Sequence, residues 1–327
     1  MRLSKTAEGR PSAIIDRALT LELVRVTESA AIAAAGWRGK GEEMAADQAA
    51  VQAMEAELRN VRVRGRIVIG EGEEGEADRL WVGQSVGTGE GPEVDIAVDP
   101  LEGTTLCAKN QQDAIAVLAM AERGGLLNAP DVYMTKIAIG PEYPAGTVDL
   151  DWPALENVKA LAAAKGVPMT EIVTCVLDRP RHGALIDELR SASIPIKLIG
   201  DGDIAGIIHA TNTEESGVDI YLGSGGAPEG VLAAAALRCV GGHMQGRLIL
   251  DTPDKRAKAR RMGIEDPDRK YSTEDMASGD VLFAATGVTD GSLLPGVNLK
   301  KSLIRTSTLV MRSWSRTVRW ITAEHAR

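Results

Sequence analysis

The stretch VDIAVDPLEGTT, residues 94 to 105, reads as a buried strand that carries acidic residues in and just beyond it. An unpaired carboxylate is costly to bury, so these acids need a reason to be there. The Asp-Pro pair is expected to end the strand, and the glycine that follows allows a sharp turn. This turn would bring Asp99, Glu102 and the Thr104 hydroxyl into one small volume. Carboxylates that share a small volume repel each other unless a cation lies among them.

Composition and charge restrict the class of protein. The 327 residues are 44% hydrophobic, 25% charged and 3% aromatic, which is typical of a soluble α/β protein with an aliphatic core. No apolar run approaches the ~20 residues that span a bilayer, and the first residues lack the apolar core of a secretory signal, so we expect a cytoplasmic location. A formal charge of -9 without a basic block argues against nucleic acid or a membrane as partner. The three cysteines are expected to be buried thiols.

The spacing of apolar residues predicts two helices, over residues 14–36 and 43–59, separated by a glycine-containing break. Short β-branched runs after the second helix predict strands, of which RGRIVIGEG contains the first. From about residue 153 strands and helices alternate, which predicts a parallel sheet whose ligands gather at the carboxyl ends of the strands. Residues 313–316 are expected to be the turn of a final hairpin.

The predicted fold class is α/β, with α+β character in the N-terminal half and helices layered on mixed sheets. Two domains are predicted. Residues 1–152 would form a metal-binding domain of helices and a sheet. Residues 153–327 would form an α/β substrate domain that contributes Glu229 and ends in strands between residues 280 and 323.

Acidic residues also collect at other predicted strand ends, in GEGEEGEAD (70–78) and GDGD (200–203). A single glutamate in such a place is usually a solvated loop charge. Several carboxylates with no neighbouring His or Cys are instead the hard oxygen ligands that favour Mg²⁺ or Mn²⁺ over zinc. Two such ions can hold the attacking and the leaving oxygen of a phosphoryl transfer, so this pattern indicates that the carboxylates form a metal cradle.

Several longer stretches carry a resemblance to known families. DPLEGTT (99–105) resembles the Asp-Pro-x-Asp/Glu-Gly-Thr/Ser signature of the lithium-sensitive, metal-dependent sugar and inositol phosphatases. IVIGEGE, LNAPDVYMTKIAIGP, LIGDGDIAG and MGIEDPDRKYSTEDMASGDVLFAATGVTDGSL resemble the class II, bacterial-type fructose-1,6-bisphosphatases. The resemblance extends from about residue 14 to residue 325 and implies a sugar-phosphatase fold.

The resemblance implies a role for individual residues at the metal site. It makes Thr104 the residue that orients the attacking water. The implied metal ligands are Asp47, Glu71, Asp99, Glu102 and Glu229. Asp47 by itself would be interpreted as a solvated helix face. Glu229 follows GSGGAP (223–228), a glycine-rich segment that is either a phosphate-binding loop or a plain tight turn.

A bisphosphorylated sugar needs a second anion site away from the metals. Arg179 and Arg181 are two residues apart at a predicted strand end, where their guanidinium groups could meet a phosphate. A surface ion pair is the alternative. The resemblance implies the following substrate contacts: Glu102, Gly103, Thr104, Tyr133, Arg179, Arg181, Asp201 and Asp203.

Two positions depart from the family pattern near the expected metal cluster. The family usually reads Gly-Glu-Gly-x-x-Asp-Glu-Ala-Pro, and the aspartate that would activate the water is replaced here by Gly75. Glu43 stands where the family usually has a lysine. Either Glu73 or Glu74 supplies the missing catalytic carboxylate, or the chain is a weakened phosphatase or a sensor of sugar phosphates.

The sequence therefore predicts a phosphoric monoester hydrolase that uses Mg²⁺ or Mn²⁺. The expected reaction converts fructose 1,6-bisphosphate into fructose 6-phosphate, with sedoheptulose 1,7-bisphosphate as a second substrate, in gluconeogenesis or carbon fixation. An inositol-type monophosphatase is the alternative enzyme, disfavoured by the two arginines. The resemblance also implies a homodimer or homotetramer.

Overall fold

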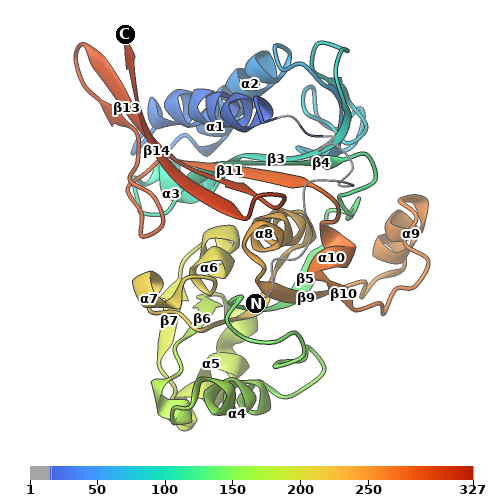
Figure 1. The fold of residues 1–327 in the computed structure, drawn as a ribbon, viewed down its shortest axis with the longest axis vertical. Coiled ribbons are helices and arrows are strands. Elements are labelled where there is room, and N and C mark those ends of the chain that lie inside the picture. The colour runs from blue at the N-terminus through green and yellow to red at the C-terminus, as the bar shows by residue number, and fades with distance from the viewer. Residues whose placement is uncertain (1–14, 16, 327) are drawn as a thin grey trace, which may run out of the picture.

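The computed structural model describes residue 15 and residues 17–326, and stacks them as helices, sheet, helices, sheet and helices (Figure 1). Helices α1 (Leu19–Ala35) and α2 (Glu43–Leu58) cover the outer face of the larger sheet. Both helices were predicted, but the first begins at Leu19 rather than at residue 14, which lies outside the described residues. The break between them contains Gly39 and Gly41, which have φ values of 69° and 74° that favour glycine.

The larger sheet has eight strands in the order β12-β13-β11-β4-β3-β1-β2, with β14 paired to β13. Only β1 and β3 pair in parallel; the other pairs are antiparallel. The predicted final hairpin is β13 and β14. The strands are β1 (Arg64–Ile69), β2 (Ser85–Val86), β3 (Glu93–Glu102), β4 (Ile115–Glu122), β11 (Val281–Gly287), β12 (Asn298–Leu299), β13 (Leu303–Arg312) and β14 (Thr317–Ala326).

The smaller sheet has six strands in the order β10-β9-β5-β8-β6-β7. Strands β6, β7 and β8 pair in parallel, as the strand-helix alternation predicted, whereas β5, β9 and β10 pair antiparallel. Both sheets are therefore mixed and open, and the predicted α/β fold class is confirmed. The strands are β5 (Tyr133–Ile139), β6 (Thr174–Leu177), β7 (Ile196–Ile199), β8 (Ile220–Gly226), β9 (His243–Leu248) and β10 (Tyr271–Ser272).

Helix α8 (Ala227–Val240) lies between the two sheets, beside α6 (Asp203–His209) (Figure 1). Because sheets pack on both of its sides, α8 is apolar nearly all round and built largely of alanine. Helices α4 (Ala154–Lys165) and α5 (Gly183–Ser191) cover the outer face of the smaller sheet. The short remaining helices are α3 (Thr104–Ala108), η1 (Met169–Glu171), η2 (Pro180–His182), α7 (Thr213–Ser216), α9 (Pro253–Arg261) and α10 (Thr273–Met276).

The chain leaves the larger sheet after β4 and returns to it with β11. The sheets therefore divide the chain differently from the predicted domains 1–152 and 153–327. That division concerns units that fold separately, and it stays a prediction.

One prediction about the strand that opened the sequence analysis was wrong. Strand β3 does not end at Asp99 but continues through Pro100 to Glu102, with an irregular register against β4 between Asp99 and Glu102. A proline is tolerated there because the irregularity removes the need for its missing N–H. The turn itself is as predicted, since Gly103 has φ 85°.

The three cysteines are free and buried, as predicted. Over the part of the chain that is described, no helix is long and apolar enough to cross a membrane.

Candidate active site

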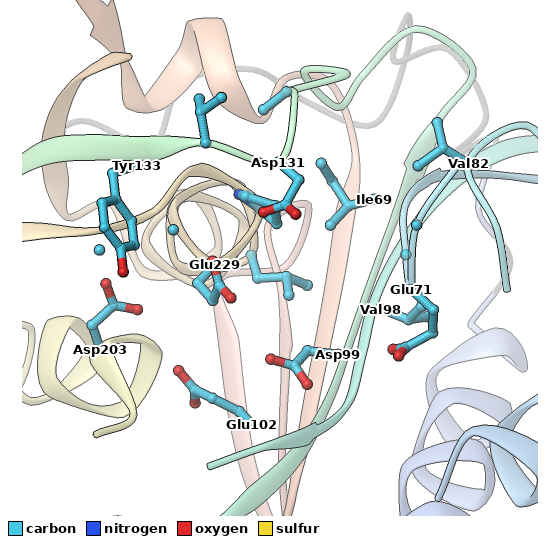
Figure 2. A pocket seen from close by; sticks show the side chains of 18 of the residues that line it. Ile69, Glu71, Val82, Val98, Asp99, Glu102, Asp131, Tyr133, Asp203 and Glu229 are labelled. Carbon is cyan, nitrogen blue, oxygen red and sulfur yellow. The ribbon is translucent and has the colours of Figure 1, made fainter. Parts of the chain in front are cut away.

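A cavity of about 720 Å³ opens where the carboxyl end of β3, the start of α8, the carboxyl ends of β6, β7 and β8, and the start of β5 meet. Figure 2 shows the carboxylates of Asp99, Glu102 and Glu229 around one shared space, with Tyr133 and Asp203 on the opposite side from Glu71. The five residues implied to bind metal all line this cavity. We call them the acidic end of the cavity: Asp47, Glu71, Asp99, Glu102 and Glu229.

The carboxylates of β3 have different partners. Asp95 accepts hydrogen bonds from the Gly124 N–H (2.6 Å) and from Arg66 (3.3 Å), so it is a paired structural charge. The register shift before Gly103 places Asp99 and Glu102 in the cavity instead. Of these acidic residues, Asp95 therefore has a structural role, whereas Asp99 and Glu102 belong to the site.

The glycine-rich segment before Glu229 is the end of strand β8 rather than a loop. Its glycines are needed because carboxylates approach the backbone closely. A Cβ atom on Gly226 would lie 1.8 Å from Oε2 of Glu229, and one on Gly225 would lie 1.9 Å from Oδ2 of Asp203. Pro228 then occupies the first turn of α8, where its missing N–H costs no hydrogen bond.

Two buried carboxylate oxygens at the acidic end have no hydrogen-bond partner among the described residues. Glu102 accepts the backbone N–H of Ile204 through Oε1 (2.9 Å), but its Oε2 is unpaired. Oε2 of Glu229 is unpaired as well. A buried polar atom without a partner is destabilising by about 1–3 kcal/mol, and more when it is charged. The acidic end is therefore incomplete without a ligand.

The acidic side chains also raise one another's pKa. Burial, together with the charges of Glu229, Glu71 and Asp47, raises the pKa of Asp99 well above its usual range. Burial and the charges of Asp99 and Asp203 do the same to the pKa of Glu102. Desolvation in the cavity wall, together with the charges of Asp47 and Glu229, raises the pKa of Glu71 to about 7. A cation among them would relieve this repulsion.

The donor chemistry of the cavity suits a hard cation, because oxygen atoms are its only strong ligands. Of the described residues that line it, none is a histidine or a cysteine. Within the described part of the chain, however, no three His, Cys, Asp or Glu side chains already stand close enough together to hold a metal ion. The assignment of the five ligands stays a prediction.

The opposite side of the cavity, which we call the arginine end, contains the predicted substrate residues Tyr133, Arg179, Arg181, Asp201 and Asp203. The Arg181 guanidinium lies 4.7 Å from the centre of the Tyr133 ring and donates to the backbone oxygen of Ser224 (2.8 Å). Nη2 of Arg179 lies 3.4 Å from Oδ1 of Asp201. This ion pair lines the cavity, so both of its members can reach a ligand.

Asp203 is held by a buried lysine that the sequence analysis missed. Nζ of Lys136 donates to Oδ2 of Asp203 at 2.6 Å, and both side chains are buried. The signal in the sequence was a lysine inside the apolar run YMTKIAIG, where a charge needs a partner. This ion pair fixes the carboxylate that was predicted to contact a sugar hydroxyl.

The segment that departs from the family pattern is only partly in the cavity. Glu73 lines the cavity and lies 3.0 Å from Nζ of Lys258, whereas Glu74 does not line it. Gly75 and Glu43 are outside the lining too. Thr104 lines the cavity at the start of α3, as expected.

Further residues of the cavity were not predicted. They are Glu76, Asp131, Lys255 and Lys258. The two lysines belong to α9, whose sequence PDKRAKARR carries five basic residues in an acidic chain. That concentration of charge was the available signal for a surface that receives anions.

Comparisons with known proteins identify the family of the chain. The family model described as bacterial fructose-1,6-bisphosphatase, glpX-encoded, matches residues 17–325. A protein of Synechococcus sp. (strain JA-2-3B'a(2-13)), named D-fructose 1,6-bisphosphatase class 2/sedoheptulose 1,7-bisphosphatase, is 46% identical over 336 residues, covering 95% of this chain and 96% of the relative. A protein of Trichodesmium erythraeum (strain IMS101) with the same name is 44% identical over 338 residues, covering 95% and 97%. The wider link to lithium-sensitive phosphatases stays a prediction. The chain belongs to the glpX-encoded family of bacterial fructose-1,6-bisphosphatases.

Proposed function

We propose that this chain is a phosphoric monoester hydrolase that removes the 1-phosphate of fructose 1,6-bisphosphate to give fructose 6-phosphate, and that it also accepts sedoheptulose 1,7-bisphosphate. The observation that carries this proposal is that one cavity holds both an incomplete acidic end and an arginine end. A sugar with a phosphate at each end needs both.

The five residues of the acidic end would hold divalent cations, Mg²⁺ or Mn²⁺. The unpaired oxygens of Glu102 and Glu229 support this assignment, because a bound cation would give each of them the partner that it lacks. When bound, the cations supply Lewis acidity toward the phosphoryl oxygens and lower the pKa of water.

The remaining steps depend on the chain's own side chains. The Thr104 hydroxyl forms one hydrogen bond with the attacking water and thereby orients it. Glu73, which lines the cavity, is better placed than Glu74 to accept the proton of that water.

At the arginine end, Arg179 and Arg181 bind the phosphate that is not cleaved. Asp201 and Asp203 accept hydrogen bonds from sugar hydroxyls. Lys136 holds the Asp203 carboxylate in place through its hydrogen bond.

Two alternatives make different demands on the cavity. An inositol-type monophosphatase has no second phosphate to bind, so it would have no use for Arg179 and Arg181. A sensor of sugar phosphates would need the arginine end but not the acidic end. Since both ends are present, a bisphosphatase uses the cavity most completely.

The test is phosphate release from fructose 1,6-bisphosphate, sedoheptulose 1,7-bisphosphate, fructose 6-phosphate and inositol 1-phosphate, each with Mg²⁺, with Mn²⁺ and with excess EDTA. We expect release from the two bisphosphates only, and none in EDTA. Release from inositol 1-phosphate at a similar rate would favour the monophosphatase. Binding of bisphosphates without any turnover would favour the sensor.

The same proposal places the protein in the cytoplasm, in gluconeogenesis or carbon fixation, as a homodimer or homotetramer. Light scattering on the purified protein at two concentrations measures the oligomer, and a mass that stays at one chain would contradict that part.

A further inference from the structure

A second cavity, of about 380 Å³, lies at the other end of α8 and shares no lining residue with the active site. It is bounded by β5, β9, the start of α10 and the turn between β13 and β14. Ile137, Ile139, Val148 and Met244 give it an apolar wall. Its volume is within the range of small-molecule sites, so a compact organic ligand would fit.

Arg238, one of the cations that line this cavity, has one N–H group without a hydrogen-bond acceptor among the described residues. Arg238, in the last turn of α8, donates to Oε1 of Glu274 through Nη1 (2.8 Å), but its Nε is buried and has no hydrogen-bond partner. A buried donor on a charged group is costly to leave unpaired. Arg238 therefore keeps part of its hydrogen-bonding capacity unused, while its side chain as a whole lines the cavity.

A second cation lies close by. Arg316, in the β13–β14 turn, has no ion-pair partner among the residues that the structure describes. Its Nη1 would be 4.0 Å from a Cβ atom on Gly241, the residue that caps the C-terminus of α8. Arg238, Arg316 and Glu274 all line this cavity. The two arginines also offset the negative end of the α8 dipole.

We propose that the second cavity binds a small organic phosphate. Two guanidinium groups match a doubly charged phosphate better than a singly charged carboxylate, because each can donate a forked pair of N–H groups. The apolar wall would receive the carbon body of the ligand. Glu229 lies nine residues before Arg238 in α8, about 14 Å along the axis. The ligand would therefore contact the helix that supplies one residue of the acidic end.

Calorimetric titration of the EDTA-treated protein with phenylphosphonate tests this proposal. The compound has a phosphate-like head and an apolar ring, and it has no ester bond that the active site could cleave. We expect it to bind more tightly than inorganic phosphate, and benzyl alcohol, which lacks the charge, not to bind. Arg316→Gln should weaken the binding of phenylphosphonate by about tenfold or more, the range of one charged hydrogen bond.

The matched control is Arg319→Gln, which removes the same charge from the same hairpin but outside the cavity. It should leave the affinity unchanged. Arg238→Gln should act like Arg316→Gln, with circular dichroism to check that loss of the Glu274 pair leaves the fold intact. Arg316 is exposed, so its variant does not depend on that check.

Arg179→Gln separates this cavity from the active site, which also attracts anions. Binding that is lost in Arg179→Gln but kept in Arg316→Gln would overturn the proposal. Equal weakening by Arg316→Gln and Arg319→Gln would overturn it too, because the attraction would then be a general effect of charge. Failure of phenylphosphonate to bind would have the same consequence.

Discussion

The two ends of the active-site cavity treat charge in opposite ways. At the arginine end, Asp203 is paired with Lys136, and Arg179 with Asp201. At the acidic end, Glu102 and Glu229 each keep a buried oxygen without a partner. The difference teaches that one end is complete when the chain has folded, whereas the other becomes complete only when a ligand binds. Ligand binding should therefore stabilise the acidic end specifically.

The largest effect on stability is expected when the Lys136–Asp203 ion pair is broken. Lys136→Met leaves the buried Asp203 carboxylate without its cationic partner, which should lower the free energy of unfolding by about 3–5 kcal/mol. Urea denaturation in EDTA measures it. Lys159→Met, on the exposed face of α4, is the control and should change little. A double variant with Asp203→Asn should recover part of the loss. If Lys136→Met costs no more than Lys159→Met, the arginine end is not held by this ion pair.

At the acidic end, removal of a charge is expected to change the free energy of unfolding in the opposite direction. Glu102→Gln removes a charge that burial and its neighbours disfavour, so in EDTA the free energy of unfolding should stay the same or rise. The same variant should lower kcat by about 100-fold or more, since a cation ligand is lost. Denaturation and phosphate release on one preparation give both values. Lower stability with normal turnover would reverse the comparison.

The third prediction tests whether the arginine end recognises the second phosphate. Arg179→Ala removes a charged hydrogen bond of about 1.5–3 kcal/mol, or about ten- to 150-fold in kcat/KM, mainly through KM. Arg190→Ala, on exposed α5, is the control. An equal rise in KM for a bisphosphate and a monophosphate would show that Arg179 does not discriminate between them.

A smaller effect is expected in the segment that carries the departures from the family. Glu73→Gln should lower kcat by about tenfold or more with little change in KM, because Glu73 lines the cavity. Glu74→Gln is its matched control and should be nearly neutral. Gly75→Asp should gain little, because Gly75 has φ 89°, where a side chain is strained. A collapse of kcat in Glu74→Gln would move the base to the neighbouring residue.

The smallest effect is a dependence of stability on pH. Glu71 has a pKa of about 7 in the folded, metal-free protein, against 4.5 for the ordinary side chain. The folded state then binds the proton more tightly, so this contribution is present below pH 4.5 and is lost as the pH rises through 7. Thermal unfolding in EDTA should therefore show stability falling over this window. Glu71→Gln should flatten the slope, and an unchanged slope would show that Glu71 is not its source.

Two residues of the acidic end, Asp99 and Glu102, could be predicted from a short local pattern, whereas Asp47, Glu71 and Glu229 were assigned by the resemblance. Asp99, Glu102 and Gly103 are close in the chain, so a strand, an acid and a turn predict their meeting. The irregular register that carries Pro100 inside β3 was missed, because it depends on pairing with β4. The local pattern thus predicted that these residues meet, but it did not predict the course of the backbone between them.

The residues that were missed depend on contacts between distant segments. Lys136 and Asp203 are 67 positions apart and meet only because the fold brings β5 and the start of α6 together. Lys258 reaches Glu73 from α9 across a still longer separation. Periodicity and composition carry no information on such pairs, which follow from the order of the strands.

The return of β11 to the larger sheet has a consequence for synthesis on the ribosome. Strand β4 pairs with β11 along its whole length, and the partners Ala121 and Val281 are 160 residues apart (281 − 121). At about 5–20 residues per second, the apolar edge of β4 would wait for its partner for about 8 to 32 s. We expect nascent chains stalled before residue 281 to be cut by protease within β4, and released protein to resist the same treatment. Resistance of the stalled chains would show that another segment covers this edge first.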